Sequence, residues 1–200
     1  MLSEDPLVRL WPGRLDPGLR ARLMDAYGGS ERGYHDLRHL REVLEHVEEL
    51  MEPDDPARET VLLAAWFHDA VYDGQGDDEE RSARLAEQEL AGTPVAGEVA
   101  RLVRLTRDHR PAADDRPGQV LCDADLAILA ANPVRYATYV AGVRGEYAWV
   151  PDPDFDAGRA AVLDDLLAKP TLFHTATARE RWERRARDNM ARELTVLRPR

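Results

Sequence analysis

The hydrophobic positions of the chain recur mostly at intervals of three and four residues, as in helices that bury one face. The clearest stripe, from about 36 to 51, comprises Leu37, Leu40, Val43, Leu44, Val47, Leu50 and Met51. A second predicted helix, from about 55 to 72, contains the segment VLLAAWF, which is apolar on every side. We expect this second helix to lie in the middle of the core.

Proline, glycine and acidic residues mark the ends of further predicted helices. Asp-Pro, Thr-Pro and Asn-Pro pairs at 16–17, 93–94 and 132–133 start helices that end near residues 27, 109 and 150. Other helices are expected at about 79–90, 120–131, 155–168 and 176–197, with a loop at 110–118. No stretch alternates convincingly with a period of two, so the sequence predicts an all-α helical bundle.

Composition narrows the function classes and the compartment. The 200 residues carry a net charge of −11, which disfavours nucleic-acid polymers and membrane surfaces as partners. A metal or a local arginine cluster can still reverse the field inside one cleft, so a small anionic substrate fits. Cys122 is the single cysteine, and we find neither a secretory signal nor an apolar run long enough to span a bilayer. These features predict a cytoplasmic protein.

Three short segments carry candidate metal ligands. His35 and His39 are four residues apart at the edge of the apolar stripe, where histidines that only form hydrogen bonds are the alternative. His68-Asp69 ends the apolar helix, where a divalent cation would partner both side chains and a helix cap is the alternative. Asp123 and Asp125 begin another apolar helix, which suits ligation or interaction with the helix dipole.

The order His39 … His68-Asp69 … Asp125 resembles the signature of the HD superfamily of metal-dependent phosphohydrolases. The flanking residues are similar to a bacterial branch described as predicted metal-dependent HD phosphohydrolases. The similar segments are Tyr34-His35-…-His39, Trp66-Phe67-His68-Asp69-…-Tyr72-Asp73, Glu80-…-Ser82-Ala83, Thr106-…-His109, Asp123-Ala124-Asp125-Leu126, Arg144-…-Glu146-Tyr147 and Ala186-Arg187-…-Asn189. The resemblance implies a single HD-like domain over 1–200, with a core at about 34–130 and C-terminal helices at about 133–197 packed on it.

The resemblance also implies residue roles. The metal would be bound by His39, His68, Asp69 and Asp125. Asp125 is taken as the last ligand because it matches the Asp of an Ala-Asp-Arg-Leu segment in alarmone hydrolases. Asp123 would then orient a ligand or a water, although the reverse assignment of Asp123 and Asp125 stays open.

His35 is implied as the general acid. In cyclic-nucleotide phosphodiesterases, which have a similar Tyr-His-Asn-…-His segment, the first histidine protonates the leaving group and the second binds metal. Asp36 stands where that segment has Asn. We therefore expect Asp36 to help keep His35 protonated.

His109 and Arg144 are further candidates for the site. His109 would hold a second metal or contact a substrate phosphate, and an exposed histidine at a helix end is the alternative. Because only one such extra histidine is evident, we expect a single metal. Arg144 can bind phosphate with two nitrogens, but a structural ion pair, with Glu146 or another acid, is the preferred interpretation.

The implied activity is hydrolysis of a small, nucleotide-like phosphoester by metal-activated water, with His35 and Asp69 as catalytic residues. The histidine and carboxylate ligands suit Mn, Fe, Co, Ni, Zn or, less well, Mg. A di-iron oxygenase of the HD type and a non-catalytic metal-binding helical module are the alternatives. The charged final helix leaves both a homodimer interface and a solvated surface open.

Overall fold

A computed structural model of the chain describes residues 5–13, 15–74 and 76–198. The regular elements in these ranges are all helices, which confirms the predicted all-α fold. They are α1 (Pro6–Arg9), α2 (Pro17–Tyr27), α3 (Leu37–Leu50), α4 (Arg58–Phe67), α5 (Asp78–Glu89), α6 (Ala96–Leu105), α7 (Arg116–Leu126), the 3-10 helix η1 (Ala127–Ala130), α8 (Pro133–Glu146), α9 (Asp152–Ala168) and α10 (Ala176–Leu197).

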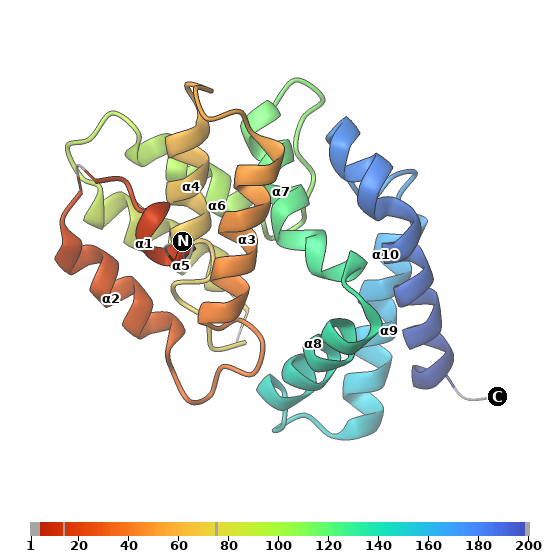
Figure 1. Ribbon diagram of the computed structural model, residues 1–200. Helices are drawn as coiled ribbons and strands as arrows, with labels where there is room; N and C mark the ends of the chain where they lie inside the picture. The colour runs from red at the N-terminus through yellow and green to blue at the C-terminus, as the bar shows by residue number, and fades with distance from the viewer. Residues whose placement is uncertain (1–4, 14, 75, 199–200) are drawn as a thin grey trace.

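Helix α4 lies at the centre of the N-terminal part, in contact with α3, α5, α6 and α7 (Figure 1). Its residues 61–67 are at most 4 % exposed, as expected of a segment that is apolar on every side. Helices α8, α9 and α10 lie on the other side of η1, and both α8 and α10 pack against this short helix. The C-terminal helices therefore meet the core at the end of α7.

Helix α4 ends at Phe67 rather than near residue 72, which corrects the predicted boundary. The next backbone groups find partners elsewhere in the fold: Arg32 donates to the carbonyls of Asp69 and Ala70, and the Ser82 hydroxyl bonds both backbone groups of Val71. Because these groups are satisfied without a further helical turn, the chain can bend directly after His68.

Several other boundaries differ from the prediction. Helix α7 begins at Arg116, inside the predicted loop at 110–118, because the Asp115 carboxylate accepts from the Gly118 amide and Pro117 occupies the first turn. Helix α6 begins at Ala96 rather than at the Thr93-Pro94 pair, and α1 was not predicted. None of the helices in the described ranges is long and apolar enough to cross a membrane.

Candidate metal centre and its cleft

The four predicted metal ligands come together at one point in the fold. His39 belongs to α3, His68 and Asp69 follow α4, and Asp125 lies in the last turn of α7. The Nε2 atoms of His39 and His68 are 3.0 Å apart. Asp69 Oδ2 lies 3.3 Å and 3.0 Å from these two nitrogens, and Asp125 Oδ1 lies 3.3 Å and 3.6 Å from them.

This donor set fits a divalent cation. His39, His68 and Asp69 each offer a ligand atom within 4.8 Å of the others. Two imidazole nitrogens that bind one ion at about 2.1 Å and at a right angle would be about 3.0 Å apart, and the observed separation of the two Nε2 atoms is 3.0 Å. Two histidines and two carboxylates suit first-row transition metals.

The charges at the centre depend on one another. Burial lowers the pKa of His68. Asp69 and the other neighbouring groups raise this pKa by more than burial lowers it, so the net pKa is well above the usual value. Burial similarly lowers the His39 pKa, but hydrogen bonds with Asp125 and Asp69 leave it raised. Both carboxyl pKa values are held well below normal despite burial. Without a cation, protons on the histidines would have to balance the carboxylates; bound metal replaces them.

A backbone carbonyl fixes the orientation of the His68 ring. His68 Nδ1 lies 2.7 Å from the carbonyl oxygen of Ala65, one turn earlier in α4. Because a carbonyl only accepts, Nδ1 carries the proton, and the lone pair of the neutral ring is on Nε2, which faces the other ligands.

His35 lies in the turn before α3, not on the helix itself, and Glu146 of α8 holds it there. Glu146 Oε1 accepts from the backbone amides of Tyr34 and His35 at 2.8 Å each, and Oε2 lies 2.8 Å from His35 Nδ1. The His35 ring also stacks on Tyr72, with centroids 4.0 Å apart. One carboxylate from the C-terminal helices thus positions the predicted general acid.

The carboxylate of Asp36 bonds to the backbone of α3. Asp36 is the N-cap of α3, and its carboxylate accepts from the amides of Arg38 and His39. A capping aspartate explains the departure from Asn at this position, because both residues are good N-caps. The carboxylate beside His35 is Glu146, more than 100 residues later.

Two features that sequence reasoning missed hold the His35 turn in place. Arg32 donates to the backbone carbonyls of His35 and Asp69 at 2.7 Å each, and so ties the turn to the segment that carries the ligands. Gly33 packs so closely on Gly142 of α8 that a Cβ atom on either one would overlap the backbone of the other. The Gly-Tyr-His order gave no sign of this contact, because its partner is remote in sequence.

His109 contacts the predicted last ligand. Its Nε2 lies 2.8 Å from Asp125 Oδ2, the carboxylate oxygen that is not facing the two histidines. The His109 backbone has a φ of 51°, which is uncommon for a residue with a side chain. A strained backbone at a half-buried residue that touches a candidate ligand is typical of functional sites.

Asp123 and Arg144 lie outside the centre. The two Asp123 oxygens accept from the backbone amides of His174 and Thr175, at 2.7 Å each, so this carboxylate anchors the start of α10. Arg144 pairs with Asp152 and donates to two backbone carbonyls of the α8–α9 connection. It makes a structural ion pair, as preferred, but its partner is not Glu146.

A cleft of about 940 Å³ leads to the centre. Asp125, His35 and His109 contribute to its wall, whereas the more deeply placed His39 and His68 are 1 % exposed. The other lining residues include several aromatic side chains: Tyr34, Tyr72, Tyr139, Tyr147 and Phe155. One side of the centre is therefore open toward a space that suits a small molecule with an apolar or ring-shaped part.

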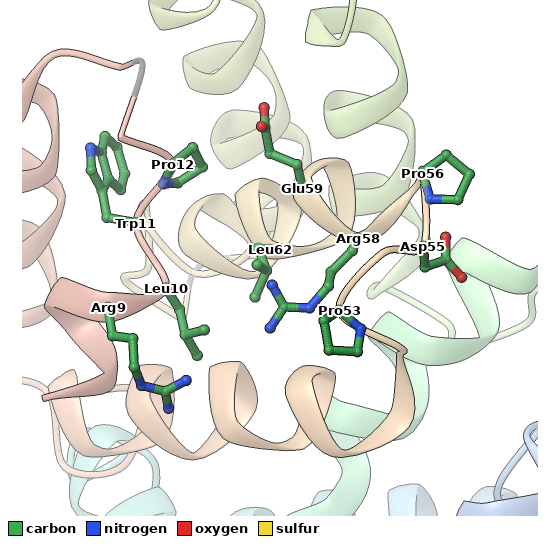
Figure 2. Close-up of a pocket in the computed structure, with 10 residues that line it drawn as sticks. All are labelled: Arg9, Leu10, Trp11, Pro12, Pro53, Asp55, Pro56, Arg58, Glu59 and Leu62. Carbon is green, nitrogen blue, oxygen red and sulfur yellow. The ribbon is translucent and has the colours of Figure 1, made fainter. Parts of the chain in front are cut away.

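A smaller hollow of about 270 Å³ lies between the N-terminal segment and the start of α4 (Figure 2). Its lining includes Arg9, Trp11 and Arg58 but none of the candidate ligands. Arg9 is paired with Glu48, and Arg58 is 3.5 Å from the same carboxylate. This hollow therefore has no evident part in the chemistry of the centre.

Residues 36–128 match the family model described as HD domain. The match contains all four candidate ligands and His109, and it supports assignment of this segment to the HD superfamily. HD domains bind divalent metals and are generally metal-dependent phosphohydrolases. No curated protein and no solved structure matches the chain significantly. The single-domain organisation over 1–200 stays a prediction.

Proposed function

We propose that the protein is a metal-dependent phosphohydrolase of the bacterial HD branch that hydrolyses a small, nucleotide-like phosphoester. One observation carries this proposal: His35, which is paired with Glu146, lines the same cleft as Asp125, which lies 3.3 Å from His39 of the ligand cluster. A purely structural metal site would be closed on all sides, whereas a catalytic site keeps an open position. Here Asp125 belongs both to the cluster and to the cleft wall.

His39, His68, Asp69 and Asp125 would hold the divalent cation. When bound, such a cation lowers the pKa of water and polarises a phosphoryl oxygen. The protein supplies the rest of the arrangement: the Ala65 carbonyl sets the His68 tautomer, and His109 orients Asp125 through its second oxygen. Asp69, 14 % exposed in its side chain, is placed to orient a water molecule as well as to bind the cation.

His35 is the proton donor in this account. Its Nδ1 is bonded to Glu146, whose pKa is lowered on balance because hydrogen bonds from His35 and backbone amides outweigh burial. The hydrogen bond between Glu146 and Nδ1 orients the His35 ring and leaves Nε2 to donate a proton to the leaving oxygen as the P–O bond breaks. The water oxygen forms the new bond to phosphorus.

The aromatic lining of the cleft supports the choice of substrate. Tyr34, Tyr72, Tyr139 and Tyr147 together with Phe155 give flat apolar surfaces beside the centre. A nucleobase or another planar ring can pack against such surfaces, whereas an inorganic phosphate chain has no apolar surface that could pack against them. The cleft, at about 940 Å³, is also large enough for a mononucleotide.

The test is hydrolysis of p-nitrophenyl phosphate, bis(p-nitrophenyl) phosphate and a panel of nucleotides with added divalent metals. The wild type would be compared with His68→Ala and Asp69→Ala. His46→Ala is the matched control, because His46 lies on α3 at the surface, where its partners are Glu49 and Trp182. We expect hydrolysis by the wild type and the control, and its loss in both ligand variants.

Two other results would contradict the proposal. A folded wild type that binds metal but hydrolyses none of these compounds would favour the non-catalytic metal-binding module. Near two equivalents of bound iron, together with oxygen consumption, would favour the di-iron oxygenase, which needs more histidine ligands than the one cluster found in residues 5–13, 15–74 and 76–198.

A further inference from the structure

Arg159 of α9 lies in the wall of the cleft and is held on one edge only. Its Nε and Nη2 atoms donate to the Glu193 carboxylate at 2.7 Å and 3.2 Å, and Nη2 also donates to the Tyr139 hydroxyl at 2.7 Å. Within the described part of the chain, Nη1 has no partner. Because the side chain is only 10 % exposed, the guanidinium is fixed before any ligand arrives.

Tyr139 presents a second donor in the same wall. Its oxygen accepts from Arg159, so its own hydroxyl proton is left for another acceptor, and no described residue takes it. Burial raises the pKa of Tyr139, although Arg159 opposes this, so the phenol stays neutral and able to donate. Arg159 Nη1 and the Tyr139 hydroxyl are thus two adjacent N–H and O–H donors whose hydrogens are unused.

No hydrogen bond among the described residues joins Arg159 or Tyr139 to a candidate metal ligand; Arg159 bonds to Glu193 and Tyr139. The Arg159 guanidinium lies 5.0 Å from the centre of the Tyr139 ring. The Tyr139 ring contacts Tyr34, and the Tyr34 ring contacts His39, with 4.6 Å between centroids in each case. Arg159 is therefore linked to the candidate ligand His39 through two successive ring contacts, and not by a direct contact among the described residues.

We propose that Arg159 and Tyr139 form a second anion-binding subsite, which recognises a phosphate group of the substrate other than the one that is hydrolysed. This inference rests on the proposed function for the position of the scissile group. The substrate of the protein is then a small molecule with two separate phosphate groups. Glu193 acts as a positioning residue. It holds Nε and Nη2 of Arg159 and so leaves Nη1 to donate to the ligand.

The test compares matched ligands on matched variants. Dissociation constants of adenosine 3′,5′-bisphosphate and adenosine 5′-monophosphate would be measured by calorimetry on metal-loaded wild type, Tyr139→Phe, Arg159→Lys and Tyr136→Phe. Tyr136 is the control, because it donates to the same Glu193 carboxylate but does not line the cleft. Thermal unfolding of each variant would verify that it is folded.

We expect the wild type to bind the bisphosphate at least about tenfold more tightly than the monophosphate, as one hydrogen bond to a charged group would give. Tyr139→Phe and Arg159→Lys would reduce that ratio about tenfold, and Tyr136→Phe would keep it. A ratio near one in the wild type, or an equal loss in Tyr136→Phe, would overturn the subsite. Absent hydrolysis with an intact binding ratio would instead refute only the proposed function.

Discussion

The pairing of Glu146 with His35 gives the sharpest prediction. Glu146→Gln keeps the size of the side chain, and its amide oxygen can still accept from the backbone amides of Tyr34 and His35. In the wild type, His35 Nδ1 lies 2.8 Å from the second carboxylate oxygen. In the variant an amide nitrogen takes the place of this oxygen, and an amide nitrogen cannot accept a hydrogen bond. The substitution therefore removes one charge-assisted hydrogen bond and leaves the turn in place.

Two effects of known size follow from this loss. A hydrogen bond to a charged group contributes about 1.5–3 kcal/mol, so the free energy of unfolding at pH 7 should fall by about that amount. Without its partner at Nδ1, the His35 ring would also lose the contact that orients it, and with it the role of general acid. Loss of a general acid lowers kcat by about 10²–10⁴-fold for an alkoxide leaving group and much less for p-nitrophenolate, which departs without a proton.

The assay measures kcat for the phosphoester of a nucleoside and for a p-nitrophenyl phosphoester. The free energy of unfolding of each protein is measured by denaturant titration. Glu183→Gln is the control, because Glu183 also accepts from two backbone amides, those of Leu172 and Phe173, but does not line the cleft. We expect the control to lose stability alone. An equal loss of kcat for both esters, or no loss in Glu146→Gln, would refute the role of His35 as the acid.

Stability should also respond to pH through Glu146. Its pKa in the folded protein is lower than in the unfolded chain, so its contribution is full above about pH 4.3 and is lost as the pH falls through the folded-state value. The wild type should therefore lose stability below about pH 4 more steeply than Glu146→Gln. Parallel acid unfolding curves for the two proteins would contradict this.

The remaining predictions concern packing and metal affinity. Gly33→Ala and Gly142→Ala should each lower the free energy of unfolding by about 1–3 kcal/mol, because the new methyl group overlaps the partner backbone. Gly145→Ala, whose Cβ would have no atom within 4 Å, should show no loss in the same denaturant titration. His109→Ala should weaken metal binding about 10–100-fold in a chelator competition, since the second oxygen of Asp125 loses its partner; an unchanged affinity would argue against this positioning role. Metal binding near pH 7 should release protons, because the pKa values of metal-free His39 and His68 are raised. Calorimetric enthalpies that do not depend on the buffer would contradict that charge balance.

The sequence predicted the helices whose ends carry their own local signals. Helices α2 and α10 begin and end as expected, because Asp16-Pro17 and Thr175 cap their first turns. The Asp115-Arg-Pro signal at the start of α7 was equally present but was interpreted as part of a loop. The end of α4 carried no such signal, since it depends on Arg32 and Ser82, which reach the backbone from other segments.

The candidate site divides in the same way. The resemblance brought forward the predicted ligands His39, His68, Asp69 and Asp125, and the structure brings these four side chains together. The roles of Glu146 and Arg159 depend on α8 and α9 packing across the cleft, a contact between residues far apart in the chain. Periodicity and spacing describe single helices, so they could not show which arginine, Arg144 or Arg159, would face the cleft.

The most direct test of the central claim is the metal content of purified protein by elemental analysis after growth with supplemented metals. Wild type would be measured beside His68→Ala, Asp125→Asn and Asp123→Asn, with folding verified by circular dichroism. We predict about one equivalent of a transition metal in the wild type and its loss in His68→Ala and Asp125→Asn. Asp123→Asn should keep the metal, because the Asp123 carboxylate accepts from the backbone amides of His174 and Thr175. A folded wild type without metal, or one whose metal survives both His68→Ala and Asp125→Asn, would contradict the account.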